Sequence, residues 1–222
     1  MKKLLIFDLD GTILNTVDSL VVTICRTLEI LGLPAITEEE TRRFVGNGAF
    51  LLVKRALKAA GDEELTRLDE GMKVFMELFE DLCTYNVTPY ENMEEILHEL
   101  KNSGYTLAVL SNKPDKMAVK VVETAFGQNL FSVIAGQKEG VPKKPDPAGV
   151  VRIAGDLGIE LSSVIYIGDS ETDIETARNS GVPALIGSWG YRSREDLIDL
   201  SPDILIDDTK DLINSVYTLS ER

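Results

Sequence analysis

Apolar and polar residues follow two different rhythms along the chain. Short unbroken apolar runs, which are typical of strands buried on both faces, occupy residues 4–9, 105–111, 131–136, 163–169, 182–187 and 203–206. Apolar residues at helical spacing separate most of these runs, near 93–103, 115–126, 147–157 and 173–180, with a last helix at 209–219. This alternation predicts an α/β fold: a Rossmann-like parallel sheet with helices on both faces.

Residues 16–84 break this rhythm, because four successive segments all have helical spacing. Thr37 followed by Glu40 has the form of a capping box at the start of one of them. We therefore predict a helical cap domain, residues 15–85, inserted after the first strand into a core domain of residues 1–14 and 86–222. Its hinges are expected at 11–15 and 84–90.

Polar side chains that could carry chemistry follow several of the predicted strands. Asp8 and Asp10 end the first apolar run, Ser111 and Asn112 end the second, and a later run is followed by another pair of aspartates, Asp169 and Asp173. In an open parallel sheet, ligands bind at the carboxyl ends of the strands. Asp8 and Asp10 are two residues apart, so on an extended chain their side chains would point the same way. A single site is therefore predicted at this edge.

Four carboxylates that converge on one edge need a compensating positive charge. At ~4 Å and an effective dielectric constant near 20, one pair repels by about 4 kcal/mol. Carboxylate oxygens without a histidine cluster favour Mg²⁺ over zinc or copper. The chain has a single histidine, His98, which lies off the apolar stripe of its helix and is expected on the surface.

The same edge offers groups that suit a phosphate. Thr12 and Ser111 supply hydroxyl groups, Asn112 supplies an amide, and Lys144 supplies an ammonium group that the following proline presents on an extended backbone. Hydroxyl donors beside an ammonium and Mg²⁺ form a phosphate-binding arrangement. The nucleophile is left open between an aspartate carboxylate, Ser111 and metal-bound water.

Composition narrows the choice of partner. A net charge of −14 argues against nucleic acid and anionic membranes as partners. It does not argue against a small anionic substrate, because salt screens distant charges beyond ~8 Å. No apolar run approaches the ~18 residues of a membrane span. Cys25 and Cys83 both lie in helical patterns, which predicts reduced thiols and a cytoplasmic protein; monomer and homodimer stay equally open.

Four motifs in order, "DLDGT", "LSN", "KKPDP" and "GDSETD", resemble those of the haloacid dehalogenase superfamily over nearly the whole chain. Within that family, "FVGNG" at 44–48 and "GSWGY" at 187–191 are similar to the phosphoglycolate phosphatases. The resemblance implies an Mg²⁺-dependent phosphatase with a helical cap. Its substrate would be a small phosphorylated metabolite, with 2-phosphoglycolate favoured.

The resemblance also implies residue roles. Asp8 would attack the phosphoryl group to form an aspartyl-phosphate, and Asp10 would act as the general acid and base. Mg²⁺ would be held by Asp8, the backbone carbonyl of Asp10, Asp169 and, through water, Asp173. Phosphate and substrate would be bound by Thr12, Ser111, Asn112 and Lys144 in the core and by Gly46 and Asn47 in the cap.

Two departures and two alternatives accompany this interpretation. Asn15 stands where many relatives carry an aspartate, and the presence of Asp10 argues against cleavage of a carbon–halogen bond. A sugar phosphomutase shares the aspartyl-phosphate but returns the group to its substrate. A non-catalytic phospho-acceptor module also combines acidic residues, a hydroxyl, a lysine and Mg²⁺ on a parallel sheet, but has no helical insertion after its first strand.

Overall fold

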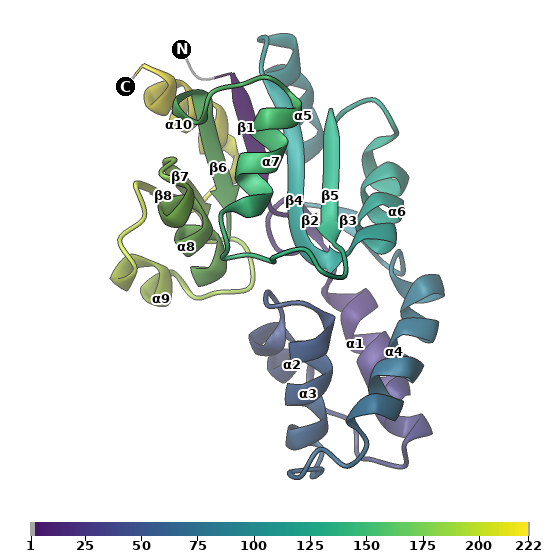
Figure 1. Cartoon of the computed structure of the whole chain (residues 1–222). Coiled ribbons are helices and arrows are strands. Elements are labelled where there is room, and N and C mark those ends of the chain that lie inside the picture. The colour runs from purple at the N-terminus through teal and green to yellow at the C-terminus, as the bar shows by residue number, and fades with distance from the viewer. Residues whose placement is uncertain (1–2, 222) are drawn as a thin grey trace.

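A computed structural model describes residues 3–221 and contains a six-stranded parallel sheet within them (Figure 1). The strand order is β5-β4-β1-β6-β7-β8. The strands are β1 (Leu4–Phe7), β4 (Thr106–Pro114), β5 (Val133–Gln137), β6 (Val164–Gly168), β7 (Ala184–Gly187) and β8 (Ile204–Ile206). β1 lies in the middle, with Phe7 paired to Val109 of β4 on one side and to Ile167 of β6 on the other.

Helices cover both faces of this sheet, which explains why its strands are apolar without interruption. The core helices are α5 (Met93–Asn102), α6 (Asp115–Phe126), α7 (Ala148–Asp156), α8 (Glu171–Ser180), α9 (Arg194–Asp199) and α10 (Leu212–Ser220). Leu5 and Phe7 pack with α5, α6 and α10, whereas Leu4 and Ile6 pack with α7, α8 and α9. The predicted α/β fold class is confirmed; α9 was not predicted.

The second body consists of four helices that lie beside the carboxyl end of the sheet, at the bottom of Figure 1. They are α1 (Val17–Ile30), α2 (Glu38–Phe44), α3 (Ala49–Ala59) and α4 (Leu68–Leu82). Thr37 and Glu40 form the predicted capping box at the start of α2. Apolar side chains from all four helices join one buried cluster with the α5 face of the sheet. Both cysteines are free thiols, Cys83 buried and Cys25 partly buried.

The chain segments that enter and leave these four helices run side by side. β2 (Leu14–Asn15) pairs antiparallel with β3 (Thr88–Pro89). These short strands fall inside the two segments predicted as hinges, at 11–15 and 84–90.

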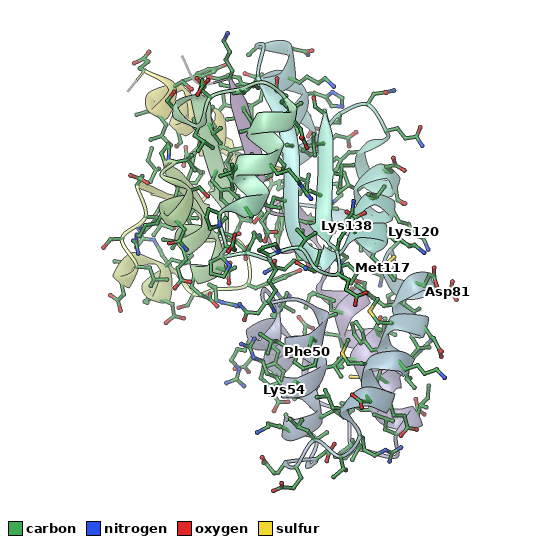
Figure 2. All side chains as sticks on the ribbon, viewed as in Figure 1. Phe50, Lys54, Asp81, Met117, Lys120 and Lys138 are labelled. Atoms are coloured by element: carbon green, nitrogen blue, oxygen red, sulfur yellow. The ribbon has the colours of Figure 1, made fainter. Side chains whose placement is uncertain are left out.

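A hydrogen bond between α6 and α4 also joins the core to the four helices, away from the β2–β3 pair. Lys120 of α6 donates a hydrogen bond of 2.6 Å to the Glu80 carbonyl of α4. Figure 2 shows Lys120 at this junction, with Asp81 of α4 facing it.

No helix between residues 3 and 221 is both long and apolar enough to span a membrane.

Candidate active site

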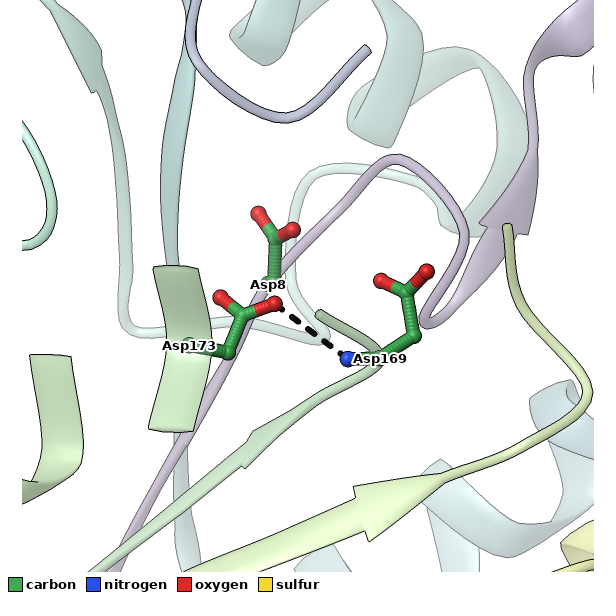
Figure 3. Close-up of side chains that lie close together, drawn as sticks. All are labelled: Asp8, Asp169 and Asp173. Carbon is green, nitrogen blue, oxygen red and sulfur yellow. Dashed lines mark hydrogen bonds between the residues drawn. The ribbon is translucent and has the colours of Figure 1, made fainter. Parts of the chain in front are cut away.

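Three buried carboxylates meet where β1 and β6 end. Asp8 follows β1, Asp169 follows β6, and Asp173 lies in the first turn of α8, which begins two residues earlier than the sequence pattern indicated. One carboxylate oxygen from each lies within 4.8 Å of the other two (Figure 3). Adjacent strands of a parallel sheet end on the same edge, and this places Asp8 and Asp169, which are 161 positions apart in sequence, next to each other.

Asp10, the fourth predicted carboxylate, does not join this cluster with its side chain. Its Oδ1 accepts hydrogen bonds from Thr16 Oγ1 at 2.6 Å and from Lys113 Nζ at 2.8 Å. The expectation that Asp8 and Asp10 point the same way assumed an extended chain, but β1 already ends at Phe7. The turn that follows, with Gly11 at φ +93°, brings Thr16 at the start of α1 back to the Asp10 carboxylate, and Asp10 lines the same cavity as Asp8.

Lys144 supplies the positive charge nearest to the three carboxylates. Its Nζ lies 2.8 Å from Asp8 Oδ1 and 2.8 Å from Asp173 Oδ1. Burial alone would lower the pKa of Lys144, but Asp173 and Asp8 outweigh burial and raise that pKa well above its usual value. Tyr166 adds a hydrogen bond of 3.1 Å to the same Asp173 oxygen. The ammonium is therefore held charged inside the protein.

The cluster nevertheless carries more negative than positive charge. Burial, and then the neighbouring Asp173, raise the pKa of Asp8 to about 7 although Lys144 opposes the shift. Burial, and then the neighbouring Asp173 and Asp8, raise the pKa of Asp169 well above its usual value. Asp8 Oδ1 is paired with Lys144 by distance only, because no donor among the described residues gives it hydrogen-bond geometry.

This arrangement fits a divalent cation. Closely spaced carboxylates with raised pKa values have an unmet demand for positive charge, and Asp8 Oδ1 retains a buried, unsatisfied lone pair. The ligand set contains oxygen only, which suits Mg²⁺. Asp173 is also engaged structurally, since its Oδ2 accepts hydrogen bonds from the backbone N–H of Asp169 and Ser170 and from the Ser170 hydroxyl. Asp8 and Asp169 are therefore the freer ligands.

Two residues predicted to bind phosphate make other contacts in the structure. Thr12 is fully buried and donates its hydroxyl to Asp169 Oδ1 at 2.9 Å, so it orients a carboxylate of the cluster. The Asn112 amide donates to the Gly46 and Lys144 carbonyls, and its oxygen accepts the Lys144 N–H. These contacts use both amide hydrogens, so Asn112 positions its neighbours. The Ser111 hydroxyl oxygen accepts the Lys113 N–H. This contact does not use the hydroxyl hydrogen, which can donate to a ligand.

The loop between α2 and α3 bears the predicted cap residues and presses against the core. Gly46, at φ +111°, lines the cavity next to Asp8 and accepts the Asn112 hydrogen bond. Asn47 does not line that cavity: its amide donates to the Thr172 hydroxyl at 3.0 Å, and its carbonyl accepts from Lys143. In this structure the contacts of Asn47 hold the loop on the core.

A cavity lies between the core and the four helices. From the core it is lined by Asp8, Asp10, Ser111, Asn112, Lys113 and Pro114. The four helices and their loops contribute Leu20, Val45, Gly46, Gly48, Ala49, Leu52, Phe75 and Phe79. One wall is polar and charged, whereas the other is apolar. A small substrate would therefore place its reacting group on the core side.

Sequence reasoning missed three residues around Asp10. Lys113 contacts the Asp10 carboxylate from the end of β4, a strand that runs three residues beyond the apolar run. Thr16 donates to the same oxygen, and the Tyr191 hydroxyl accepts the Thr16 N–H at 2.9 Å. The backbone N–H of Tyr191 also donates to Asp169. Lys113 follows "LSN" directly, so extending that motif by one residue would have found it. Tyr191 ends the "GSWGY" segment, to which sequence reasoning assigned no site role. His98 is exposed, as predicted.

Comparison with known proteins agrees with this geometry. The family model described as haloacid dehalogenase-like hydrolase matches residues 5–186. The chain belongs to this family of hydrolases, as its motifs predicted, and is an enzyme of that class.

Within the family its similarity is to phosphoglycolate phosphatases. It is 32% identical over 218 residues to the phosphoglycolate phosphatase of Pseudomonas savastanoi pv. phaseolicola, covering 96% of this chain and 79% of that one. It is 34% identical to the phosphoglycolate phosphatase of Pasteurella multocida, covering 93% and 94% of the two chains. The crystal structure of a predicted phosphoglycolate phosphatase from Haemophilus somnus 129PT superposes with a TM-score of 0.88 at 31% identity, covering 97% and 98%.

Proposed function

We propose that this protein is an Mg²⁺-dependent phosphatase that hydrolyses a small phosphorylated metabolite, with 2-phosphoglycolate as the favoured substrate. One observation supports the proposal above all: Asp8 belongs both to the buried carboxylate cluster and to the lining of the cavity. A carboxylate in that position can reach a substrate in the cavity while Lys144, buried in the core, balances its charge. The similarity to phosphoglycolate phosphatases supports the choice of substrate.

In the proposed reaction, a carboxylate oxygen of Asp8 attacks phosphorus, and the bond from phosphorus to the substrate oxygen breaks. Asp10 gives a proton to the departing oxygen and later takes one from the water that attacks the aspartyl-phosphate. That second attack releases inorganic phosphate and restores Asp8. The Ser111 hydroxyl and the Lys144 ammonium bind the transferring oxygens.

Bound Mg²⁺ would neutralise negative charge on the transferring phosphoryl group. Asp8 and Asp169 would hold it through carboxylate oxygens, joined by the Asp10 carbonyl and supported by Asp173. We assign residues 15–85 to a cap that excludes water from the cavity when it lies against the core.

The cavity favours a phosphatase over a sugar phosphomutase. Among the residues that line it, those from the four helices carry apolar side chains or none. A sugar presents several hydroxyl groups, and each would lose hydrogen bonds to water on such a wall. A phospho-acceptor module is disfavoured because the chain belongs to a hydrolase family and carries four helices after β1.

The test is release of inorganic phosphate from 2-phosphoglycolate, with Mg²⁺ and with chelator, for wild type and Asp8→Asn. Release by wild type with Mg²⁺, and none with chelator or with Asp8→Asn, is expected. Asp69→Asn removes an exposed carboxylate from α4 and should keep full activity. Activity that survives in Asp8→Asn would contradict the proposed nucleophile, and formation of an isomerised sugar phosphate from a sugar phosphate would favour the mutase.

A further inference from the structure

Lys113 is a buried ammonium group that the proposed reaction does not use. Its side chain is 1% exposed, and it lines the cavity. Its Nζ lies 2.8 Å from Asp10 Oδ1 on the core side and 4.7 Å from the centre of the Phe79 ring on α4. A buried charge is costly unless it is paired, so the position of Lys113 calls for an explanation beyond packing.

The bonding of this ammonium is incomplete. An ammonium group has three N–H donors, and among residues 3–221 only Asp10 accepts a side-chain hydrogen bond from Lys113. The Phe79 ring offers its face to the charge, which is a weaker partner than a carboxylate. Lys113 can therefore bind a second anion while it keeps its ion pair with Asp10.

Charge around the cavity singles out the same residue. Lys113 is the one cationic side chain in the described lining, since Lys144 is paired with Asp8 and Asp173 and does not line this cavity. Gly48 and Ala49, at the start of α3, line the cavity as well. Backbone N–H groups in a first helical turn lack partners within the helix, so they add donors for an anion that Lys113 holds.

We propose that Lys113 is a specificity-determining residue that selects phosphate monoesters bearing a second anionic group, a carboxylate, close to the phosphate. The assignment rests on the proposed function, because it places the phosphoryl group at Asp8. The substrate carboxylate then lies against Lys113, between the core and the apolar wall. In that water-poor space the charge pair is strong, and a neutral analogue forfeits it.

The alternative is that Lys113 acts only through Asp10, as a positioning residue. A matched pair of substrates separates the two roles: 2-phosphoglycolate, and 2-hydroxyethyl phosphate, in which a neutral CH₂OH replaces the carboxylate. Lys113→Met keeps most of the apolar stem and removes the charge. Lys113→Arg keeps the charge, and Lys116→Met removes an exposed ammonium from α6 as the control.

Lys113→Met should lower kcat/KM for 2-phosphoglycolate by roughly 30-fold or more, the loss expected for a charged hydrogen bond. It should change kcat/KM for 2-hydroxyethyl phosphate by less than about fivefold. Lys113→Arg should keep most of the preference for the carboxylated ester, and Lys116→Met should match wild type. Thermal unfolding of each variant shows whether it is folded; if Lys113→Met is not, the ratio measured with Lys113→Arg and with Lys113→Gln decides.

Equal losses on both esters would overturn the inference and assign Lys113 to Asp10, and a parallel shift in the pH profile of kcat would accompany that result. Equal use of the two esters by the wild type would overturn it as well. If wild type hydrolysed neither these esters nor an aryl phosphate, the proposed function itself would fail, and that outcome is distinct from a failed substrate preference.

Discussion

The two walls of the cavity differ in polarity and charge: the core wall is polar and charged, whereas the helical wall is apolar. The core wall contributes carboxylates, a hydroxyl and an ammonium, all from residues at the ends of strands. The helical wall contributes aliphatic and aromatic side chains and three positions in the turn between α2 and α3. Reactivity therefore resides in the core. The helices can influence a reaction only through shape, exclusion of water and backbone groups.

This difference has an electrostatic consequence. Burial makes each charge at this edge of the core more costly, and together with the neighbouring carboxylates it raises the pKa values of Asp8 and Asp169. The same burial strengthens every attraction between a substrate anion and the core cations.

The largest effect is expected from Lys144→Met. It would remove the ammonium that, among residues 3–221, pairs with Asp8 and Asp173 in the carboxylate cluster. Breaking a buried ion pair costs about 3–5 kcal/mol, and losing a donor to the transferring oxygens costs about a hundred- to a thousandfold in kcat. Denaturant unfolding without metal and phosphate release with Mg²⁺ measure the two effects. Lys116→Met, which removes an exposed ammonium from α6, is the control. Similar stability for the two variants would contradict the role of Lys144.

The core wall was largely predictable from the sequence. Asp8 and Asp169 each follow an apolar run directly, and strand ends in a parallel sheet meet at one edge, so their convergence followed from the pattern. The contact that Thr12 makes was not predictable, because a hydroxyl can serve either a ligand or a neighbouring carboxylate. Asp169 lies 157 residues further along the chain, and a motif does not show which partner Thr12 takes.

The helical wall was far less predictable. Its lining side chains are apolar, and an apolar residue in a helical pattern gives no sign of whether it faces a core or a cavity. The direction of the Asn47 side chain depends on Thr172, which belongs to the other body. The pairing of β2 with β3 involves two residues from each strand, too few for any periodicity to appear.

The second prediction concerns pH and metal binding at the core wall. The pKa of Asp8 is raised from 3.8 to about 7, so the folded protein holds a proton that the unfolded chain has lost between these values. Stability of the metal-free protein should therefore fall as pH rises from 3.8 and level off above 7. Mg²⁺ must displace that proton, so its affinity should rise roughly tenfold per pH unit below 7.

The measurement is the increase in melting temperature on adding Mg²⁺, taken at several pH values on either side of the Asp8 pKa. The increase should grow with pH and then become constant. In Asp8→Asn this growth should largely vanish. An Mg²⁺ effect that does not change with pH would mean that no carboxylate of the cluster loses a proton on metal binding.

The third prediction concerns a leucine-to-alanine change that enlarges the cavity on its helical side. Leu52 of α3 lines the cavity, whereas Leu57 of the same helix is buried outside it. Each leucine-to-alanine change should cost about 2–5 kcal/mol of stability. Only Leu52→Ala should also lower kcat/KM for 2-phosphoglycolate, by about tenfold, and improve the relative rate with bulkier phosphate esters. Kinetics with esters of increasing size measure the ranking. An identical ranking for both variants would show that this wall does not select by size.

The smallest effect is expected where the core holds the helices in place. Arg192, in the loop after β7, donates to the Arg42 and Val45 carbonyls near the end of α2, and pairs with Glu171 of its own body. Its planar guanidinium holds these separated acceptors with several nitrogens in a fixed geometry, which the single nitrogen of a lysine cannot reproduce. Arg192→Lys should weaken closure by about 1 kcal/mol, equivalent to a roughly fivefold change in the closed population.

A closed population reduced in this way should raise KM severalfold and leave kcat within about twofold, since the reacting groups on the core wall are untouched. Steady-state kinetics give both constants, and small-angle scattering with and without inorganic phosphate reports the opening. Arg178→Lys alters a hydrogen bond to the Leu200 carbonyl that stays inside the core, so it should change neither. If kcat fell as strongly as KM rose, the α2 contacts would be assembling the reacting groups as well as closing the cavity, and the division of labour between the two walls would not hold.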